Sequence, residues 1–203
     1  MKTILITGFD PFDQETINPA FEAIKLLPDQ ILNGRIIKLE VPTQFKKGPQ
    51  VVIEAIHQYQ PDIIMCIGQA GGRSMITPEF VAINHAHARI CDNTGEQPLQ
   101  KKVDQKGPDA YFSTLPVYKM VDALNQQDIP ANVSYSAGTF VCNTLMYKVL
   151  HTIKINHVDA IAGFIHVPFI EKQVQDKPIN TPYMDLEQIV KGLKICIETC
   201  LEI

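Results

Sequence analysis

Short apolar runs alternate along the chain with segments of helical periodicity. Six runs are apolar or β-branched and are bounded by Gly, Pro, Asn or Asp, which predicts strands at residues 4–7, 36–41, 63–67, 80–84, 133–136 and 158–166. Several are apolar at nearly every position. This pattern is typical of parallel strands that are buried on both faces of a sheet.

Helices are predicted between these strands. Four segments repeat apolar residues at i, i+3, i+4 and i+7, beginning at Val52, Val117, Cys142 and Leu186. A further helix is expected at residues 20–27, where Asn18 would be the N-cap and Pro19 the first helical residue. Gly48-Pro49 is expected to start the second helix and Thr181-Pro182 the last one.

This alternation predicts an α/β fold, a three-layer α/β/α sandwich around a mostly parallel, twisted sheet. A length of 203 residues suits one domain, so we expect residues 1–203 to form a single domain. Residues 91–108 and 171–182 are polar and aperiodic, which predicts two long loops. Ligands of such folds bind at the carboxyl ends of the strands.

Composition narrows the class of protein. Hydrophobic residues make up 45% and the net charge is −4, so nothing provides the basic surface that nucleic-acid binding requires. No apolar run approaches the roughly 18–20 residues that span a bilayer, and we read the short N-terminal run as a strand rather than a signal peptide. Five widely spaced cysteines disfavour a disulfide framework, and we therefore expect a cytoplasmic protein.

Cys142 lies where a predicted strand passes through Ala137-Gly138 into a helix whose apolar positions begin at the cysteine. Free N–H groups and the positive dipole end of a helix start stabilise a thiolate, so we expect a thiol pKa below its ordinary ~8.5. The same N–H groups suit an oxyanion. A cysteine that begins an apolar stripe equally fits a structural role in the core, and its position alone leaves both readings open.

A nucleophilic cysteine needs a base, and His166 stands at the carboxyl end of a predicted buried strand. Glu79 directly precedes the predicted strand 80–84, where a carboxylate could orient the imidazole. Both residues also have structural readings, His166 as a hydrogen-bonded strand end and Glu79 as a solvated charge. His57 and His151 lie among polar neighbours on predicted helices, and we expect both at the surface.

Three other segments carry weaker signals. His85-Ala86-His87 has no second acidic or thiol cluster at ligand spacing, so no metal is predicted. The glycine-rich segment 68–73 matches neither nucleotide-binding motif and is read as an active-site loop, with a phosphate cradle as the alternative. Residues 8–12 bring the rings of Phe9 and Phe12 beside the expected ligand face.

Together, these segments closely resemble the pyrrolidone-carboxylate peptidases (pyroglutamyl peptidase, type I). The matching motifs are Gly8-Phe9-Asp10-Pro11-Phe12 with Asn18-Pro19, Ile76-Thr77-Pro78-Glu79 with Val81-Ala82-Ile83-Asn84 and Ala88-Arg89-Ile90, Ser136-Ala137-Gly138-Thr139-Phe140-Val141-Cys142-Asn143, and Gly163-Phe164-Ile165-His166-Val167-Pro168. The resemblance runs nearly end to end. It implies a cysteine peptidase that removes N-terminal pyroglutamate, uses no cofactor and is usually a homotetramer.

The resemblance assigns roles to individual residues. It implies Cys142 as nucleophile, His166 as general base and Glu79 as the orienting acid. It also implies substrate-binding residues, with Arg89 assisting the oxyanion and a pyroglutamyl pocket lined by Phe9, Phe12, Asn18, Gln69, Phe140 and Val141. The chain departs from the family at Phe80, where a basic residue is usual, and at Cys91, where proline is usual.

The candidate pocket suits a neutral lactam, because its residues offer apolar walls and amide partners without a carboxylate to pair an α-amine. The expected partners are therefore peptides with an N-terminal pyroglutamate. Two alternatives stay open. One is a different enzyme on this architecture, nucleoside phosphorylase-like or an amidohydrolase, and the other is a small-molecule binding module.

Overall fold

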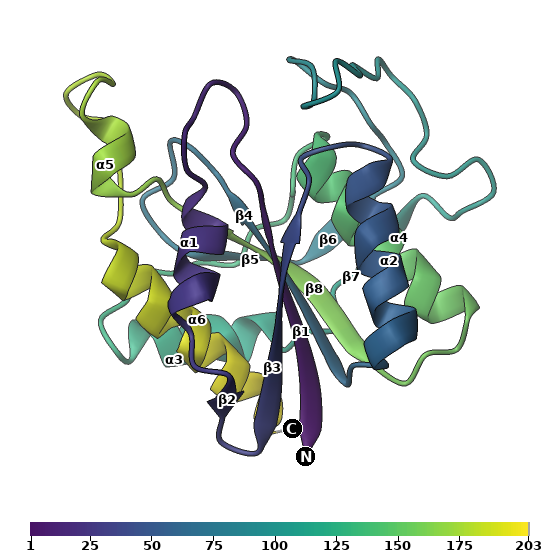
Figure 1. The fold of residues 1–203 in the computed structure, drawn as a ribbon, viewed down its shortest axis with the longest axis horizontal. Coiled ribbons are helices and arrows are strands. Elements are labelled where there is room, and N and C mark those ends of the chain that lie inside the picture. Colours follow the sequence, from purple (N-terminus) through teal and green to yellow (C-terminus); the bar gives the residue numbers. More distant parts are fainter. Residues whose placement is uncertain (203) are drawn as a thin grey trace.

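The computed structural model describes residues 1–202, so only Ile203 of the predicted domain lies outside it. A six-stranded sheet with the order β2-β3-β1-β4-β8-β5 forms the centre (Figure 1). Its strands are β1 (Lys2–Phe9), β2 (Gln30–Ile31), β3 (Gly34–Val41), β4 (Ile63–Gln69), β5 (Thr77–Glu79) and β8 (Ile161–Val167). The four inner strands are parallel and the two edge strands antiparallel, which confirms the predicted sheet.

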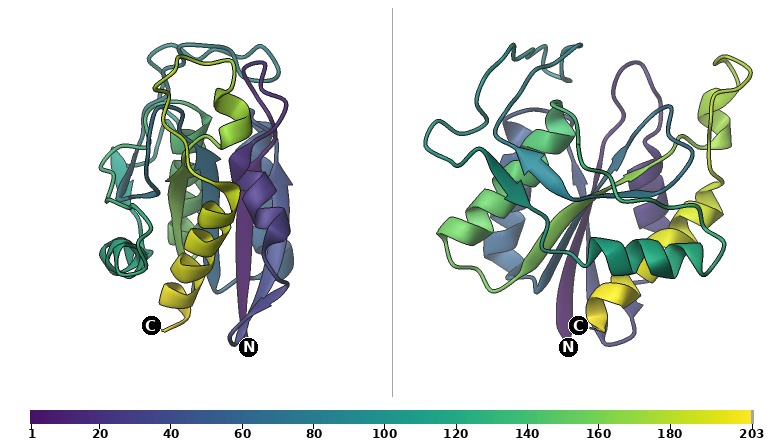
Figure 2. Two further views of the ribbon diagram at one scale, coloured as in Figure 1. Left: turned by 90° about the vertical axis from the view of Figure 1, so that its left-hand side faces the viewer. Right: turned by 180° about the vertical axis from the view of Figure 1, so that it is seen from behind.

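Helices cover both faces of this sheet, as the right-hand view in Figure 2 shows. One layer holds α1 (Pro19–Leu26), α3 (Val117–Asn125) and α6 (Leu186–Leu201), and the other holds α2 (Lys47–Tyr59) and α4 (Val141–Ile155). Alternate residues of β1 pack against the two helix layers. Ile4 and Ile6 pack in the core under the first layer and Leu5 in the core under the second, as expected for a strand buried on both faces.

Some element boundaries differ from the prediction. Residues 133–136 form no strand and touch the sheet through an isolated bridge between Ser134 and Glu79. The run 80–84 leaves the main sheet, because β6 (Val81–Ile83) pairs instead with β7 (Ala110–Phe112). The helix starts also differ, since Lys46 precedes α2 and Asp185 precedes α6.

The start of α1 follows the prediction closely. Asn18 is its N-cap, and the Asn18 Oδ1 atom accepts a hydrogen bond from the N–H of Ala20 at 3.2 Å. The four elements that sequence reasoning did not predict are β2, β5, β7 and α5 (Glu171–Val174), which have two to four residues each. Elements of this length are too short to carry a periodic pattern.

Two aspartates hold the long predicted loop 91–108 in place. The Asp92 carboxylate accepts hydrogen bonds from the backbone N–H groups of Phe45, Thr94 and Glu96 at 2.8–2.9 Å. Asp104 accepts from the ammonium of Lys148 at 2.9 Å on α4. The loop is therefore anchored to both helices of the second layer or their flanks, although it has no regular structure of its own.

We expect Asp104→Asn to lower the free energy of unfolding by about 1–2 kcal/mol at neutral pH. The hydrogen bond from Lys148 and the backbone N–H of Lys106 lower the pKa of Asp104 from 3.8 to about 2. The pKa of Asp104 is lower in the folded state than in the unfolded state. The ionised carboxylate therefore stabilises the folded protein fully above the unfolded-state pKa, and this contribution is lost as the pH falls towards the folded-state pKa.

Urea denaturation of wild type and Asp104→Asn from pH 7 downwards measures this effect. The difference should be constant above about pH 5 and shrink below about pH 4. Asp176→Asn, at an exposed position, is the matched control and should change little. A difference between wild type and Asp104→Asn that grows on acidification would contradict this assignment.

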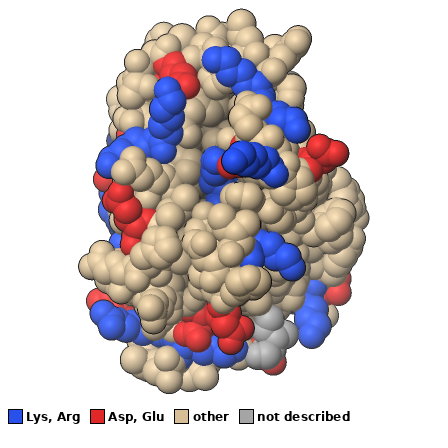
Figure 3. Space-filling model, turned by 90° about the vertical axis from the view of Figure 1, so that its right-hand side faces the viewer, with Lys and Arg blue, Asp and Glu red and all other residues tan. Residues whose placement is uncertain are grey.

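Charge is mixed on the face that carries the second helix layer. Figure 3 shows acidic and basic side chains interspersed there on a largely uncharged surface.

No helix within residues 1–202 is long and apolar enough to cross a membrane.

Candidate active site

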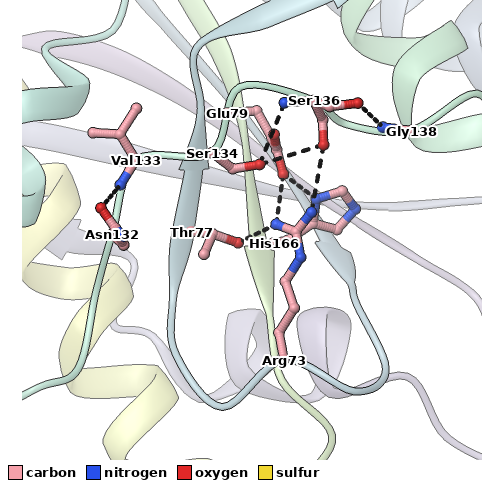
Figure 4. A network of polar contacts seen from close by, with 9 residues as sticks. All are labelled: Arg73, Thr77, Glu79, Asn132, Val133, Ser134, Ser136, Gly138 and His166. Atoms are coloured by element: carbon pink, nitrogen blue, oxygen red, sulfur yellow. Dashed lines mark hydrogen bonds and ion pairs between the residues drawn. The ribbon is translucent and has the colours of Figure 1, made fainter.

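A buried carboxylate–imidazole pair lies at the edge of the central sheet. Glu79 ends β5, His166 lies near the carboxyl end of β8, and the two strands pair in antiparallel register. His166 Nδ1 donates to Glu79 Oε1 at 2.7 Å (Figure 4). Because a carboxylate only accepts hydrogen bonds, Nδ1 carries the hydrogen, and Nε2 is an acceptor whenever the ring is neutral.

Arg73 is hydrogen-bonded to Glu79 of this pair, a contact that the sequence did not predict. Its Nη1 donates to the same Glu79 Oε1 atom at 2.8 Å and also to the hydroxyl of Thr77, while Nη2 donates to the carbonyl of Ser136 at 3.4 Å (Figure 4). The glycine-rich segment 68–73 therefore ends in Arg73, which binds the Glu79 carboxylate. This favours an active-site loop over the alternative of a phosphate cradle, since the guanidinium already has a carboxylate partner.

Glu79 is fully buried, yet it is ionised at neutral pH. Burial by itself would raise the pKa of this carboxyl group. The hydrogen bond and charge of His166, together with Ser134 and Arg73, outweigh burial and lower the pKa below its ordinary value. An ionised Glu79 can stabilise a positive charge on His166.

Cys142 is the second residue of α4, in the first helical turn as predicted. Its sulfur lies against β4, because a Cβ atom built on Gly68 would be 3.2 Å from Cys142 Sγ and 2.6 Å from the ring of Phe164. Gly68 is also the register partner of His166 across β4 and β8. The absence of a side chain at Gly68 thus lets the thiol approach the strand ends where the imidazole lies.

The expectation of a lowered thiol pKa at Cys142 is wrong. Burial raises the pKa of this thiol to about 12, and the negative charge of Glu79 acts in the same direction. The backbone N–H at the helix start and Arg73 oppose this shift without reversing it. Cys142 is therefore a neutral thiol in the unliganded protein, and a nucleophilic role would require a base that takes its proton at the same time.

A cavity of about 440 Å³ opens beside this group, at the carboxyl ends of β1, β4 and β8. Four of the residues predicted to bind substrate line it, namely Phe12, Gln69, Arg89 and Phe140. Neither Cys142 nor His166 lines the cavity, but residues close to them in the sequence do. Phe140 precedes the thiol by two residues, and Gln69 follows Gly68.

The other three predicted pocket residues lie outside the lining. Phe9 is buried with its ring centroid 6.3 Å from that of Phe164, and Val141 is fully buried in the core. Asn18 uses its side chain locally, since Nδ2 donates to the carbonyl of Asp10 and Oδ1 caps α1. In this structure these three residues are buried and do not line the cavity.

The cavity lining includes the carboxylates of Asp13 and Glu15, which the sequence-based pocket lacked, and Glu15 is paired with Lys177 at 2.7 Å. Aromatic side chains form the apolar part of the cavity. The ring of Phe140 lies 6.1 Å from that of Phe12 and packs edge-on against Phe45 at 5.2 Å. Phe169 also lines the cavity, and a Cβ atom on Gly71 would collide with its ring. Phe45 and Phe169 lie in stretches without a motif, so no signal in the sequence identified them.

The histidines outside the pair have different environments. His57 is exposed, as predicted, whereas His151 is partly buried and its Nδ1 atom lies 2.8 Å from the hydroxyl of Tyr111, so the surface prediction for His151 is wrong. The rings of His85 and His87 are parallel, with centroids 6.5 Å apart. Within residues 1–202, no group of three or more His, Cys, Asp or Glu side chains is placed to hold a metal ion.

Solved structures share this fold over nearly the whole chain. The crystal structure of pyroglutamyl peptidase I from Bacillus amyloliquefaciens has a TM-score of 0.95 and 48% identity, covering 98% of this chain and 94% of that one. Pyrrolidone carboxyl peptidase from Thermococcus litoralis has a TM-score of 0.97 and 38% identity, covering 100% and 94%.

Sequence relatives agree with the structural ones. The pyrrolidone-carboxylate peptidase of Clostridium botulinum (strain Alaska E43 / Type E3) is 52% identical over 199 residues, 98% of this chain and 93% of the relative. That of Streptococcus pyogenes serotype M4 (strain MGAS10750) is 53% identical over 194 residues, 96% and 90% respectively. The sequence model of the pyroglutamyl peptidase family matches residues 2–203. The chain therefore belongs to the pyroglutamyl peptidase family.

Proposed function

We propose that this protein is a cysteine exopeptidase that removes N-terminal pyroglutamate from peptides. The observation that carries the proposal is the His166–Glu79 hydrogen bond of 2.7 Å at the strand ends where the Cys142 thiol meets Gly68. The substrate class is inferred from the names of the relatives, which are pyrrolidone-carboxylate and pyroglutamyl peptidases. A nucleophile, a base and an orienting acid at one edge of a cavity are the requirements of acyl transfer.

In the proposed reaction, Cys142 Sγ attacks the carbonyl carbon of the pyroglutamyl residue while His166 Nε2 takes the thiol proton. Ionised Glu79 stabilises the imidazolium that forms. Backbone N–H groups at the start of α4 would hold the oxyanion, assisted by Arg89 from the cavity wall.

Collapse of this intermediate breaks the peptide C–N bond, and His166 gives its proton to the leaving amine. The product is a thioester on Cys142. His166 then takes a proton from a water molecule that attacks the thioester, the C–S bond breaks, and His166 returns this proton to the sulfur as pyroglutamate is released. One group thus serves as base and acid in alternation.

The activity is tested by release of an amine reporter from a pyroglutamyl amide under reducing conditions. We expect turnover that follows the concentration of the protein. Undetectable turnover would contradict the proposed function and favour the binding-module alternative.

We expect strong discrimination among N-terminal residues. Amides of Glu, Gln and Pro should be hydrolysed with kcat/KM values lower by roughly 10⁴-fold or more, because a site that hydrogen-bonds a lactam leaves its buried polar groups unpaired with analogues that lack it. Parallel kinetics on the four reporter amides provide the measurement. Comparable values for the pyroglutamyl and prolyl amides would contradict a lactam-specific cavity.

We also propose a cytoplasmic homotetramer. The five cysteines support a reducing location, because all of them are free thiols. The tetramer rests on the resemblance to the family. Light scattering coupled to size-exclusion chromatography tests it, and a monomeric mass at micromolar concentration would contradict it.

A further inference from the structure

The buried amide of Gln173 joins three loops around the cavity. Gln173 lies on α5, after β8, and its Oε1 accepts from the backbone N–H of Ile170 at 3.2 Å. Its Nε2 donates to Glu15 Oε2 at 3.0 Å, after β1, to Gln69 Oε1 at 2.8 Å, at the end of β4, and to the carbonyl of Ile17 at 3.4 Å. The carboxyl ends of three strands are thereby tied together.

These contacts fix the orientation of both amides. A backbone N–H only donates and a carboxylate only accepts, so Ile170 and Glu15 determine which end of the Gln173 amide is oxygen and which is nitrogen. The nitrogen of Gln173 faces Gln69, and therefore the Gln69 atom in contact with it must be the acceptor, Oε1. Rotating either amide by 180° would place like groups against each other.

The amide nitrogen of Gln69 is consequently left for a ligand. Gln69 lines the cavity and is 9% exposed. Among the described residues its Nε2 has no hydrogen-bond partner, and it is not one of the buried side-chain atoms that lack one, so it reaches solvent. A donor on a mostly buried side chain, in a cavity with aromatic walls, suits a carbonyl oxygen on a compact ring.

We propose that Gln173 is a positioning residue that determines specificity, because it holds Gln69 with its N–H₂ group presented to the ring carbonyl of the lactam. This inference rests on the proposed function. A pyroglutamyl ring carries that acceptor, whereas a prolyl ring has a methylene in its place. Without Gln173, the Gln69 amide is free to rotate and presents its oxygen to the ligand for part of the time.

We call the action of Gln173 on the ligand through Gln69 the relay. A double-mutant cycle of Gln69→Ala and Gln173→Ala on a pyroglutamyl reporter amide tests it. Gln173→Ala should raise KM by about 3–10-fold with kcat changed by less than about twofold, because the lost hydrogen bond is remote from the reacting carbon. In the Gln69→Ala background, the same substitution should change KM by less than about twofold, since the residue through which it acts is gone.

Gln175→Ala is the matched control, an exposed glutamine two residues further along the chain, and it should leave KM unchanged. Equal fold-changes for Gln173→Ala in both backgrounds, or a loss in kcat in place of KM, would overturn the relay and indicate a general disturbance of the cavity. Either result leaves wild-type turnover, and hence the proposed function, intact.

Binding of 2-pyrrolidone, the isolated lactam ring, separates the two claims further. We expect its Kd, measured by NMR titration, to rise about 3–10-fold in Gln173→Ala. If the wild type does not hydrolyse the amide, the proposed function fails while this titration still tests the relay. An unchanged Kd in the variant, or no binding to the wild type, would overturn it.

Discussion

Replacing Cys142 by alanine is expected to lower kcat for a pyroglutamyl amide by about 10⁴-fold or more. Without the sulfur no thioester forms, and the remaining groups can only assist direct attack by water. Fluorescence release at high enzyme concentration measures the residual rate. The substitution removes one atom beside Gly68, so thermal unfolding should change little.

Two other cysteines provide controls for this substitution. Cys91 is exposed, and Cys66 lies fully buried in β4, where burial raises the pKa of its thiol to about 12. Cys91→Ala and Cys66→Ala should each retain kcat within about threefold, because neither thiol takes part in the reaction. Activity of Cys142→Ala within tenfold of wild type would exclude Cys142 as the nucleophile.

The substitution Glu79→Gln should lower kcat by about 10³–10⁴-fold. The amide can still accept a hydrogen bond from His166, yet it carries no charge to stabilise the imidazolium that forms when the thiol is deprotonated. It also leaves the guanidinium of Arg73 without its carboxylate, at 2.8 Å in the wild type. We therefore expect some loss of stability beside the loss of rate.

Steady-state kinetics and urea denaturation of Glu79→Gln separate these two effects. Glu54→Gln, an exposed position on α2, is the matched control and should match the wild type in both measurements. A folded Glu79→Gln protein with kcat reduced by less than tenfold would show that the charge of Glu79 is not needed.

The parts of the fold that were predictable from sequence are those that local chemistry determines. β4 is apolar at almost every position and β1 over Ile4–Ile6 because both faces of the sheet are covered, and Asn18-Pro19 marks the start of α1. The position of Cys142 in a first helical turn follows from the same reasoning. In each case neighbours in the sequence are also neighbours in space.

The parts that were not predictable depend on contacts between distant segments. Glu79 meets His166 across 87 positions because the edge strand β5 turns back against β8. Gln173 meets Gln69 across 104 positions. The pKa of Cys142 depends on how much protein surrounds the sulfur, and this burial outweighs the helix-start effect that the sequence predicts.

We expect one of the five cysteines, Cys142, to react at the carbonyl carbon of a bound pyroglutamyl group. A pyroglutamyl chloromethyl ketone tests it most directly, because this reagent combines the ring with a carbon that alkylates thiols. After mass-spectrometric mapping, we predict one label per chain, located on Cys142, with loss of activity in proportion to labelling. Complete inactivation with the label on any other residue, or full activity after complete labelling of Cys142, would contradict the account.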